Sequence, residues 1–443
     1  MLYRKIEKFI KSHLQSSDDK ILLIDGARQI GKSYIIRYVG QKEFSNYIEI
    51  NMEEDKLGDR LFADVRTVRD FYLTLSINFG NKMGDKHNTL VFIDEIQAYD
   101  HLFTLLKFLR EDGRFTYIAS GSRLGIALKQ TSSLPLGSIL IKHMYPLDFE
   151  EFLIANGVGQ IILDTLYDNF AKRKPMPTAI HNKLMSLFRH YLLSGGLPDA
   201  VNKFIEEDNI QTTRASQDAV YQNYGIDAAK YEQMTNRRLS IQRIYEMIPS
   251  NLEKTKKRII AKDIEGKTGK RMSNYAEEFE YLIASGIALE VKSISTPTFP
   301  LIQNSGKNLL KLYMNDVGLI TSIYYRNNPK AVLYDVPSIN LVSVYETVVA
   351  QELKAHGFSL YYYDNKQNGE VDFLIDDVEH LSITPIEVKS GKNYKIHSAL
   401  NKFVSNKHYN IHRAYVLSNE QEVSVADGIT YMPIYYIMCF KNE

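Results

Sequence analysis

The chain has 443 residues, of which 44% are hydrophobic and 24% are charged. This composition is typical of folded globular proteins rather than disordered ones, and the length predicts more than one hydrophobic core. The formal net charge of +1 gives no overall field that would favour nucleic acid or a membrane as a partner. The single cysteine, Cys439, excludes a disulfide framework within the chain and zinc sites built from several cysteines.

The N-terminal residues 1–20 place apolar side chains at helical spacing, interrupted by lysines. They lack the continuous apolar core of a signal peptide. The longest apolar runs, such as 21–24 and 90–93, have the length of a strand and are far too short to cross a membrane. We therefore expect a cytoplasmic protein with no membrane partner.

Residues 1–150 alternate short apolar runs with helical patterns, which predicts a doubly wound α/β domain with a parallel sheet. Four runs have the composition of buried strands: ILLID (21–25), YIEIN (47–51), LVFID (90–94) and FTYIAS (115–120). The pattern then becomes helical over residues 151–235, with a turn between helices at 194–200.

The region 236–325 differs in charge. Between Asn236 and Asn274, eleven lysines and arginines stand against four acids. Helical patterns are followed by strand-like runs at 288–294 and 308–314, which is the order of a winged helix. Such a domain would present its lysines to the phosphates of double-stranded DNA and bind in a salt-sensitive way. The alternative is an ordinary solvated face with an excess of basic side chains.

The region 326–443 begins with a helical pattern at 341–355 and continues with apolar runs of strand length. These runs predict a second α/β unit: FSLYYYD (358–364), EVDFLID (370–376), ITPIEVK (383–389) and RAYVLS (413–418).

A phosphate-binding motif follows the first predicted strand. Residues 26–33, GARQIGKS, satisfy the pattern GxxxxGK[ST] and lead into a helical pattern. Glycines let such a loop curl so that backbone N–H groups face phosphates, and the helix N-terminus adds the positive end of its dipole. Lys32 is expected to bridge the β- and γ-phosphates of ATP, and Ser33 to ligate Mg²⁺. The predicted nucleotide-binding residues are Gly26, Ala27, Arg28, Gln29, Ile30, Gly31, Lys32, Ser33, Tyr34 and Asp94.

Two acids follow the buried run at 90–93, in the sequence LVFIDEIQ. They lie at the carboxyl edge of the predicted sheet, where sites of α/β proteins are found. Asp94 is placed to hold Mg²⁺ together with Ser33, and Glu95 to orient and activate the attacking water. The next predicted strand ends in Ser120-Gly121-Ser122, where a hydroxyl would sense the γ-phosphate. Ser120 is the preferred candidate and Ser122 the second, while either would also serve as a helix cap.

The sequence resembles a family of prokaryotic AAA-type ATPases that are joined to a C-terminal region resembling a restriction-endonuclease fold. The resemblance runs through nearly the whole chain, in the motifs GARQIGKS, LVFIDEIQ, IASGS, MYPLDFEEFL (144–153), YLLSGGLPDAV (191–201), KLYMNDVGLI (311–320), VYETVVAQEL (344–353), GEVDFLI (369–375) and PIEVKSG (385–391). It implies an ATPase core at 1–150, a helical lid at 151–235, a winged-helix-like basic domain at 236–325 and a restriction-endonuclease-like α/β domain at 326–443.

One departure from the family concerns the arginine finger. Many relatives carry an arginine after the glycine that precedes the strand leading into the PLxFEEF motif, whereas this chain has Gly137-Ser138. An arginine finger contributes about 10³-fold or more to phosphoryl transfer. Arg123, Arg110 or Lys142 would have to substitute; otherwise the protein would bind ATP and hydrolyse it slowly.

The C-terminal region resembles the PD-(D/E)-x-K arrangement of nucleases. Asp372 lies on one predicted strand and Glu387 and Lys389 lie on the next, on the same face because side chains alternate. If these strands pair, the three side chains converge, and Glu346 on the preceding helix would be a further acid. Such carboxylates would hold one or two Mg²⁺ ions for phosphodiester hydrolysis. The alternative is a solvated strand face, or a nuclease fold that has lost its activity.

Two hypotheses about function follow. In the first, Mg²⁺-dependent ATP hydrolysis by Lys32, Glu95 and Ser120 is coupled to binding or processing of DNA. In the second, the chain is a nucleotide-dependent switch or scaffold whose inactive nuclease-like domain binds a protein partner. A homo-oligomer is compatible with both.

Overall fold

The computed structural model describes residues 2–122, 124–130, 137–207, 209–230, 235–266, 269, 271–326, 328–334, 336, 339–391 and 394–442. The chain forms two units: Met1–Tyr145 with Ala284–Gly286, and Pro146–Ile283 with Ile287–Glu443. Within the described residues, none of the helices combines the length and the apolar character that a membrane crossing requires.

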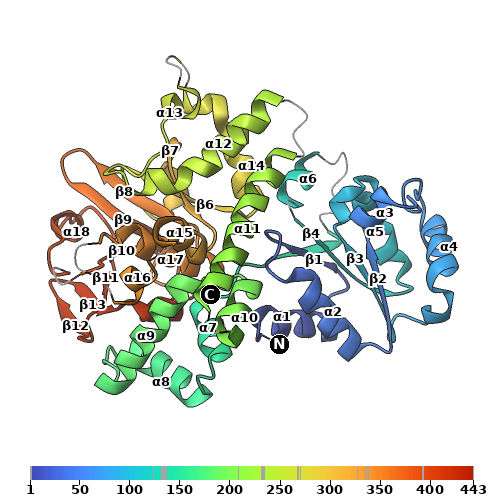
Figure 1. Ribbon diagram of the computed structural model, residues 1–443, viewed down its shortest axis with the longest axis horizontal. Helices are drawn as coiled ribbons and strands as arrows, with labels where there is room; N and C mark the ends of the chain where they lie inside the picture. Colours follow the sequence, from blue (N-terminus) through green and yellow to red (C-terminus); the bar gives the residue numbers. More distant parts are fainter. Residues whose placement is uncertain are drawn as a thin grey trace. The chain divides into compact units, whose positions relative to one another are not determined.

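The first unit is built on a parallel sheet of five strands in the order β2-β3-β4-β1-β5 (Figure 1). The strands are β1 (Ile21–Asp25), β2 (Asn46–Asn51), β3 (Thr89–Asp94), β4 (Thr116–Gly121) and β5 (Ile139–His143). The four strands that the sequence predicts are confirmed. The fifth, β5, was not among the four buried runs, but it lies where the family resemblance implied a strand leading into the PLxFEEF motif; its last three residues are exposed.

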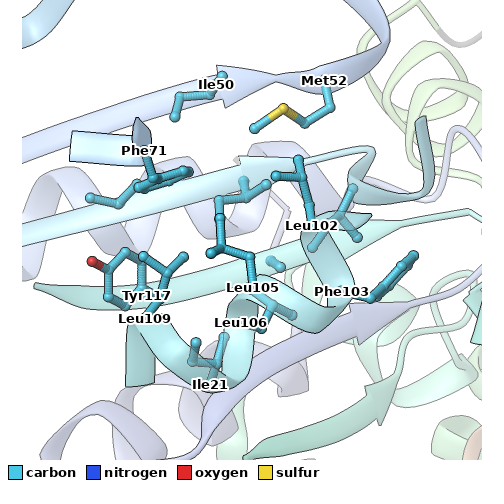
Figure 2. Close-up of a cluster of buried hydrophobic side chains, with 14 of the residues drawn as sticks. Ile21, Ile50, Met52, Phe71, Leu102, Phe103, Leu105, Leu106, Leu109 and Tyr117 are labelled. Atoms are coloured by element: carbon cyan, nitrogen blue, oxygen red, sulfur yellow. The ribbon is translucent and has the colours of Figure 1, made fainter. Parts of the chain in front are cut away.

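Helices flank this sheet: α1 (Lys5–Gln15), α2 (Lys32–Glu43), α3 (Met52–Leu57), α4 (Val68–Phe79), α5 (His101–Asp112) and α6 (Leu124–Gln130), with short 3₁₀ turns η1 (Gly80–Lys82) and η2 (Ile96–Ala98). Helix α5 supplies much of the core, because leucines recur at 102, 105, 106 and 109 on one face. Figure 2 shows these side chains gathered with Phe71 and Tyr117. Burying each of these leucines contributes about 1.5–3 kcal/mol, so the strands that carry the acids are held firmly.

The second unit contains a mixed sheet of eight strands in the order β12-β13-β11-β10-β9-β8-β6-β7. The strands are β6 (Ala288–Ile294), β7 (Ser305–Met314), β8 (Tyr361–Asn365), β9 (Gly369–Asp377), β10 (Ser382–Val388), β11 (Ala414–Ser418), β12 (Ser424–Ala426) and β13 (Ile429–Pro433). The antiparallel pair β6 and β7 joins β8 through parallel pairing. Strands from the regions 236–325 and 326–443 therefore form one continuous sheet, drawn from yellow to red in Figure 1.

The helices of the second unit are α7 (Phe149–Ala155), α8 (Gln160–Ala171), α9 (Thr178–Ser194), α10 (Pro198–Glu207), α11 (Ile210–Lys230), α12 (Thr235–Leu252), α13 (Ala261–Glu265), α14 (Ala276–Ala284), α15 (Val317–Tyr325), α16 (Lys330–Leu333), α17 (Val342–Ala355) and α18 (Ser398–Val404), with 3₁₀ turns η3 (Met272–Tyr275), η4 (Leu301–Asn304) and η5 (Ile434–Cys439). Helix α17 contacts β6, β7 and β10, and its residues 343–353 are all buried. This helix is therefore surrounded by protein, not laid on the surface.

Several motifs that mark the family resemblance meet in a buried polar network. The Tyr191 hydroxyl donates to the Leu147 carbonyl at 2.6 Å and to Glu352 Oε1 at 3.0 Å, and the same Glu352 oxygen accepts the backbone N–H of Phe149 at 2.8 Å. Gln351 donates to the Tyr191 hydroxyl at 2.8 Å. These side chains from α9 and α17 fix the entry to α7, so the motifs have a structural role in this unit.

Asp316 is the second centre of this network. Its Oδ2 accepts the N–H of Gly196 at 2.6 Å, and its Oδ1 accepts the N–H of Gly318 at 2.9 Å, which caps α15. Burial raises the pKa of the Asp316 carboxyl to about 6, although these backbone donors oppose the shift. Because the pKa of Asp316 is higher in the folded than in the unfolded chain, folding favours its protonated form. The stability that this protonation contributes is complete below the unfolded pKa of about 3.8 and is lost as the pH rises through about 6.

Replacing Asp316 with alanine is expected to lower the free energy of unfolding by about 3 kcal/mol, because two buried N–H groups lose their acceptor. Chemical denaturation followed by circular dichroism measures the change. The control is Asp218→Ala, which breaks a surface pair with Arg326 and should cost about 1 kcal/mol or less. Equal costs for the two variants would contradict a stabilising role for Asp316.

Candidate functional site

The predicted phosphate loop lies between β1 and α2. Gly26 has φ 151° and Gly31 has φ 92°, a conformation that side chains other than glycine rarely adopt. Gln29, at φ 63°, is one of the few described residues other than glycine in the left-handed region. The loop therefore makes the tight curl that the sequence motif requires, and α2 begins at its end with Lys32.

Lys32 is buried, and its Nζ donates to the carbonyl oxygens of Gly26 at 2.9 Å and Ala27 at 2.7 Å. Burial lowers the pKa of the ammonium, whereas the nearby carboxylates of Glu95 and Asp94 oppose that shift. The lysine thus bonds to its own loop, at the helix end that favours anions.

Asp94, at the end of β3, is a shared acceptor. Its Oδ2 accepts the Ser33 hydroxyl at 2.7 Å and its Oδ1 accepts the Ser120 hydroxyl from β4. Burial raises the pKa of the Asp94 carboxyl, and the two hydroxyl bonds oppose the shift. A carboxylate beside a hydroxyl is a set of hard oxygen ligands of the kind Mg²⁺ takes, so Ser33 and Asp94 fit the expected cation.

Glu95, expected to activate the attacking water, bonds to side chains that the sequence did not indicate as its partners. Its Oε2 accepts from the Gln97 amide, from the Ser122 hydroxyl at 3.2 Å and from the Ser122 N–H at 3.4 Å. Ser122 is thus beside Glu95, while Ser120 is beside Asp94. The role of Gln97 was missed, although it belongs to the same DEIQ sequence; its position two residues after Glu95 was the available signal.

The remaining loop residues differ in environment. Arg28 bonds to Glu53 at 2.8 Å and to the Ser122 hydroxyl at 3.4 Å, so it joins the loop to the Glu95 side of the site. Ile30 is fully buried, whereas Tyr34 is 55% exposed on α2. The side chain of Ile30 therefore anchors the loop in the core, whereas the side chain of Tyr34 faces solvent.

The candidate substitutes for an arginine finger have other partners. Arg110 pairs with Asp19 at 2.7 Å and donates to the Ser138 hydroxyl at 3.4 Å. Lys142 lies over the ring of Phe9, at 4.7 Å from its centroid. Arg123 lies outside the described residues. Arg110 and Lys142 are thus engaged by other groups of the first unit.

A second cluster of charged groups lies in the second unit, on side chains from β9, from the end of β10 and from α17. Strands β9 and β10 pair with each other, in the antiparallel sense, and Ile386 is paired with Phe373. Asp372 Oδ2 accepts the N–H of Val388 at 2.8 Å. Lys389 Nζ donates to Glu387 Oε1 at 2.8 Å. We call the set Glu346, Asp372, Glu387 and Lys389 the carboxylate centre.

The members of the carboxylate centre act on one another's charge. Burial raises the pKa of Asp372 well above its usual value, and Glu387 and Glu346 add to the shift. Burial also raises the pKa of Glu387. The pKa of Lys389 is raised by these acids against the effect of its burial. The three side chains that the sequence predicted to converge, and the further acid Glu346, thus influence one another's charge, and their role as a metal site stays a prediction.

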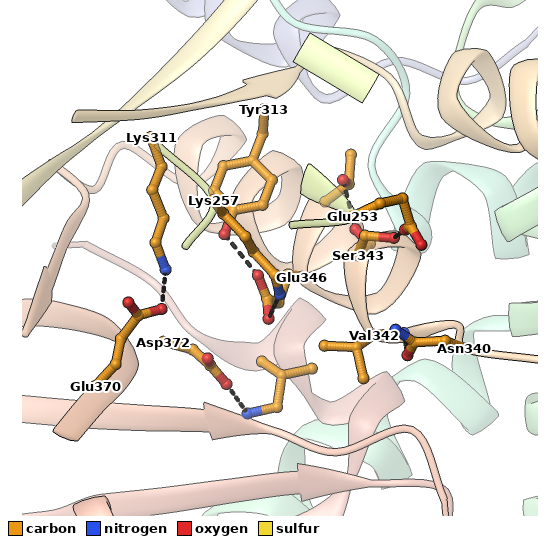
Figure 3. A network of polar contacts seen from close by, with 12 residues as sticks. Glu253, Lys257, Lys311, Tyr313, Asn340, Val342, Ser343, Glu346, Glu370 and Asp372 are labelled. Atoms are coloured by element: carbon orange, nitrogen blue, oxygen red, sulfur yellow. Dashed lines mark hydrogen bonds and ion pairs between the residues drawn. The ribbon is translucent and has the colours of Figure 1, made fainter. Parts of the chain in front are cut away.

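Glu346 has two further partners that the sequence did not suggest (Figure 3). Its Oε1 is paired with Lys257, and its Oε2 accepts the Tyr313 hydroxyl at 2.7 Å. Although burial opposes it, Lys257 and Lys311 hold the pKa of Glu346 below its usual value. Lys311 is paired with Glu370. Two lysines from the preceding region of the chain, Lys257 and Lys311, thus lie next to the carboxylate centre.

One other group of acids has the spacing of a metal site. Among the described residues, Asp377, Glu379 and His380 bring ligand atoms within 4.8 Å of one another. The three acids of the carboxylate centre do not form so tight a group. Because Asp377 and His380 bond to each other at 3.0 Å in a partly exposed turn, this arrangement is accounted for without an ion.

Many side chains of the basic stretch 236–274 have acidic partners within the second unit. These pairs are Arg237 with Glu277 and Glu278, Lys254 with Asp263, Lys257 with Glu346, and Arg258 with Asp364. Lys267 and Lys270 lie outside the described residues. The excess of basic residues counted along the sequence therefore overstates the charge that this region offers to DNA.

Family models match three segments of the chain. Residues 18–153 match an AAA domain, and residues 185–331 and 343–437 match two domains of unknown function, DUF8612 and DUF4143. The first segment contains the phosphate loop, Asp94 and Glu95. This match supports an AAA-type P-loop ATPase domain in the first unit. The other two carry no assigned activity, so the nuclease-like domain remains a prediction.

A protein of Haemophilus influenzae (strain ATCC 51907 / DSM 11121 / KW20 / Rd), described as uncharacterized, is 26% identical over 184 residues. The match covers 39% of this chain and 44% of that protein, so the chain spans less than half the length of this relative.

Two solved structures are similar in part. The Walker-type ATPase PABY2304 of Pyrococcus abyssi has a TM-score of 0.44 at 13% identity, covering 73% of this chain and 96% of that one. The ORC1 protein of Aeropyrum pernix in complex with DNA has a TM-score of 0.31 at 12% identity, covering 76% and 93%.

Proposed function

We propose that the first unit binds ATP with Mg²⁺ and hydrolyses it to ADP and phosphate. The observation that carries the proposal is Asp94, which accepts the hydroxyls of Ser33 at the phosphate loop and Ser120 at the next strand. This single carboxylate connects the predicted phosphate, cation and sensing positions. The AAA match over residues 18–153 supports the same conclusion.

The residues divide the work as follows. Lys32 exchanges its two loop carbonyls for oxygens of the β- and γ-phosphates, which are stronger acceptors because they are charged. Ser33 and Asp94 would hold Mg²⁺, which neutralises phosphate charge when bound. Glu95 takes a proton from the attacking water while the water oxygen forms a bond to the γ-phosphorus. The bond from the γ-phosphorus to the bridging oxygen breaks, and ADP leaves.

Release of phosphate from ATP by the purified protein, with Mg²⁺ and with or without double-stranded DNA, tests this function. We expect hydrolysis that requires Mg²⁺. Stimulation by DNA would favour coupling of the two activities, whereas turnover that DNA leaves unchanged would favour the nucleotide-dependent switch. ATP binding without hydrolysis under any condition would contradict the enzymatic proposal.

A second candidate function is metal-dependent hydrolysis of DNA phosphodiesters at the carboxylate centre. It is favoured by Glu387, which is 6% exposed and whose Oε2 is buried with no hydrogen-bond partner. A buried carboxylate oxygen without a donor is costly unless a ligand satisfies it. Glu346, Asp372 and Glu387 would hold the metal that activates water, and Lys389 would support charge on the phosphate. The water oxygen bonds to phosphorus while the bond to the leaving sugar oxygen breaks, and that oxygen is protonated.

Replacing Asp372 with asparagine is expected to abolish cleavage of double-stranded DNA, because the charge that holds the metal is lost. The matched control is Asp376→Asn on the same strand, whose Oδ1 accepts the N–H of Leu301 at 3.0 Å and which lies outside the centre. Gel analysis with Mg²⁺ or Mn²⁺ measures cleavage. An identical digestion pattern from both variants would identify a contaminating nuclease and would leave the protein-binding scaffold as the function of this domain.

A further inference from the structure

The segment 253–258 is part of the connection between α12 and α13, and its Lys257 reaches the carboxylate centre. Within the described structure, residues 255–259 make no backbone-to-backbone hydrogen bonds. Lys257 pairs with Glu346, and the next residue, Arg258, pairs with Asp364 at 2.9 Å. Lys257 and Arg258 thus tie this segment to acids more than eighty residues later in the chain, in addition to the contacts of Glu253 with Ser343 and of Lys254 with Asp263.

Lys257 and a metal ion would compete for the same carboxylate. Both oxygens of Glu346 are already engaged, Oε1 by Lys257 and Oε2 by the Tyr313 hydroxyl at 2.7 Å. Figure 3 shows the two groups converging on Glu346, with Asp372 beside them. The Lys257 side chain is 14% exposed and that of Glu346 is 2% exposed, so little water separates them. A divalent cation would have to displace the ammonium before Glu346 could become its ligand.

The rest of the centre has unused capacity for a cation. Glu387 Oε2 is buried and unpartnered. Four carboxylates, those of Glu346, Glu370, Asp372 and Glu387, face three lysines, Lys257, Lys311 and Lys389. Without Lys257, and with all four acids ionised, the acids exceed the lysines by two negative charges, which one divalent cation neutralises. The centre can therefore exist in two states. In one, Lys257 is bound and Glu387 Oε2 has no partner; in the other, a divalent ion takes the place of Lys257.

We propose that Lys257 is an internal counter-ion that closes the carboxylate centre, and that the segment 253–258 must withdraw before the centre binds a divalent cation. This inference rests on the metal-binding role proposed above for the centre. It assigns Lys257, which the sequence placed on a DNA-binding surface, to the control of that site.

The test is a titration of the full chain with Mn²⁺ in the absence of nucleotide. Electron paramagnetic resonance measures the concentration of free Mn²⁺ at each step. Binding that Asp372→Asn removes is assigned to the carboxylate centre and separated from binding at the phosphate loop. We expect Lys257→Met to bind Mn²⁺ at the centre at least tenfold more tightly than the wild type. Lys254 lies in the same segment as Lys257 and pairs with Asp263 of α13 at 2.9 Å. The control Lys254→Met removes this pair and should leave the Mn²⁺ affinity unchanged.

The outcomes separate the two proposals. Equal Mn²⁺ affinity of Lys257→Met and the wild type, with binding lost in both on Asp372→Asn, would overturn the role of Lys257 and leave the metal centre standing. No Mn²⁺ binding at the centre in either protein would overturn both. If Lys257→Met does not fold, as judged by thermal unfolding, Lys257→Gln keeps a donor for Glu346 without the charge and carries the same expectation.

Discussion

Lys32→Ala is expected to abolish ATP binding at micromolar nucleotide concentrations. The ammonium now bonds to two loop carbonyls and is the buried cation beside Asp94 and Glu95. Each charged hydrogen bond to a phosphate contributes about 1.5–3 kcal/mol, so losing two weakens binding by at least about a hundredfold. Isothermal titration calorimetry with ATP and Mg²⁺ measures the change.

The matched control for this variant is Lys42→Ala, in the last turn of the same helix, where the ammonium lies over the ring of Tyr38. This variant should bind ATP like the wild type. Tight ATP binding by Lys32→Ala would refute the assignment of residues 26–33 as a phosphate loop, whatever the rest of the fold resembles.

Glu95→Gln is expected to bind ATP with nearly unchanged affinity and to lower the rate of hydrolysis by about 10²–10⁴-fold, the usual contribution of a general base. Glutamine keeps the shape and can still accept from Gln97 and Ser122, but it cannot take the proton from water. Single-turnover hydrolysis separates this chemical step from binding and product release.

Glu54→Gln, which replaces an exposed acid in α3 of the same unit, is the control and should hydrolyse ATP at the wild-type rate. Normal turnover by Glu95→Gln would show that another group activates water. The Ser122 hydroxyl and Gln97 amide that hold Glu95 would then have only a structural role.

Features with a local cause could be predicted from the sequence. The phosphate loop follows from its glycines and Lys32, and β3 follows from a run of apolar residues that ends in two acids. Strand β5 was indicated only by the family resemblance, because an edge strand with three exposed residues lacks a buried apolar run. The contact of Glu95 with Ser122 was also missed, since Ser122 directly follows strand β4 while Glu95 follows β3, and only the folded sheet brings the two together.

The carboxylate centre shows the same limit. Alternation along a strand places Glu387 and Lys389 on one face, and antiparallel pairing adds Asp372. Nothing in this local pattern indicates Lys257, which is 89 residues away from Glu346 along the chain. For the same reason, counting basic residues from 236 to 274 does not reveal that Lys257 and Arg258 pair with Glu346 and Asp364, acids that lie far away in sequence.

The parallel pairing of β6 with β8 has a consequence for how the chain can be divided. Sequence families place a boundary between residues 331 and 343, yet the sheet passes across it without a break. A fragment starting at residue 343 would expose β8 as a new edge strand, ready to pair with other molecules and aggregate. It would also remove Lys257 and Tyr313, the two partners of Glu346. We therefore expect the two segments to be stable only when they are expressed and folded together.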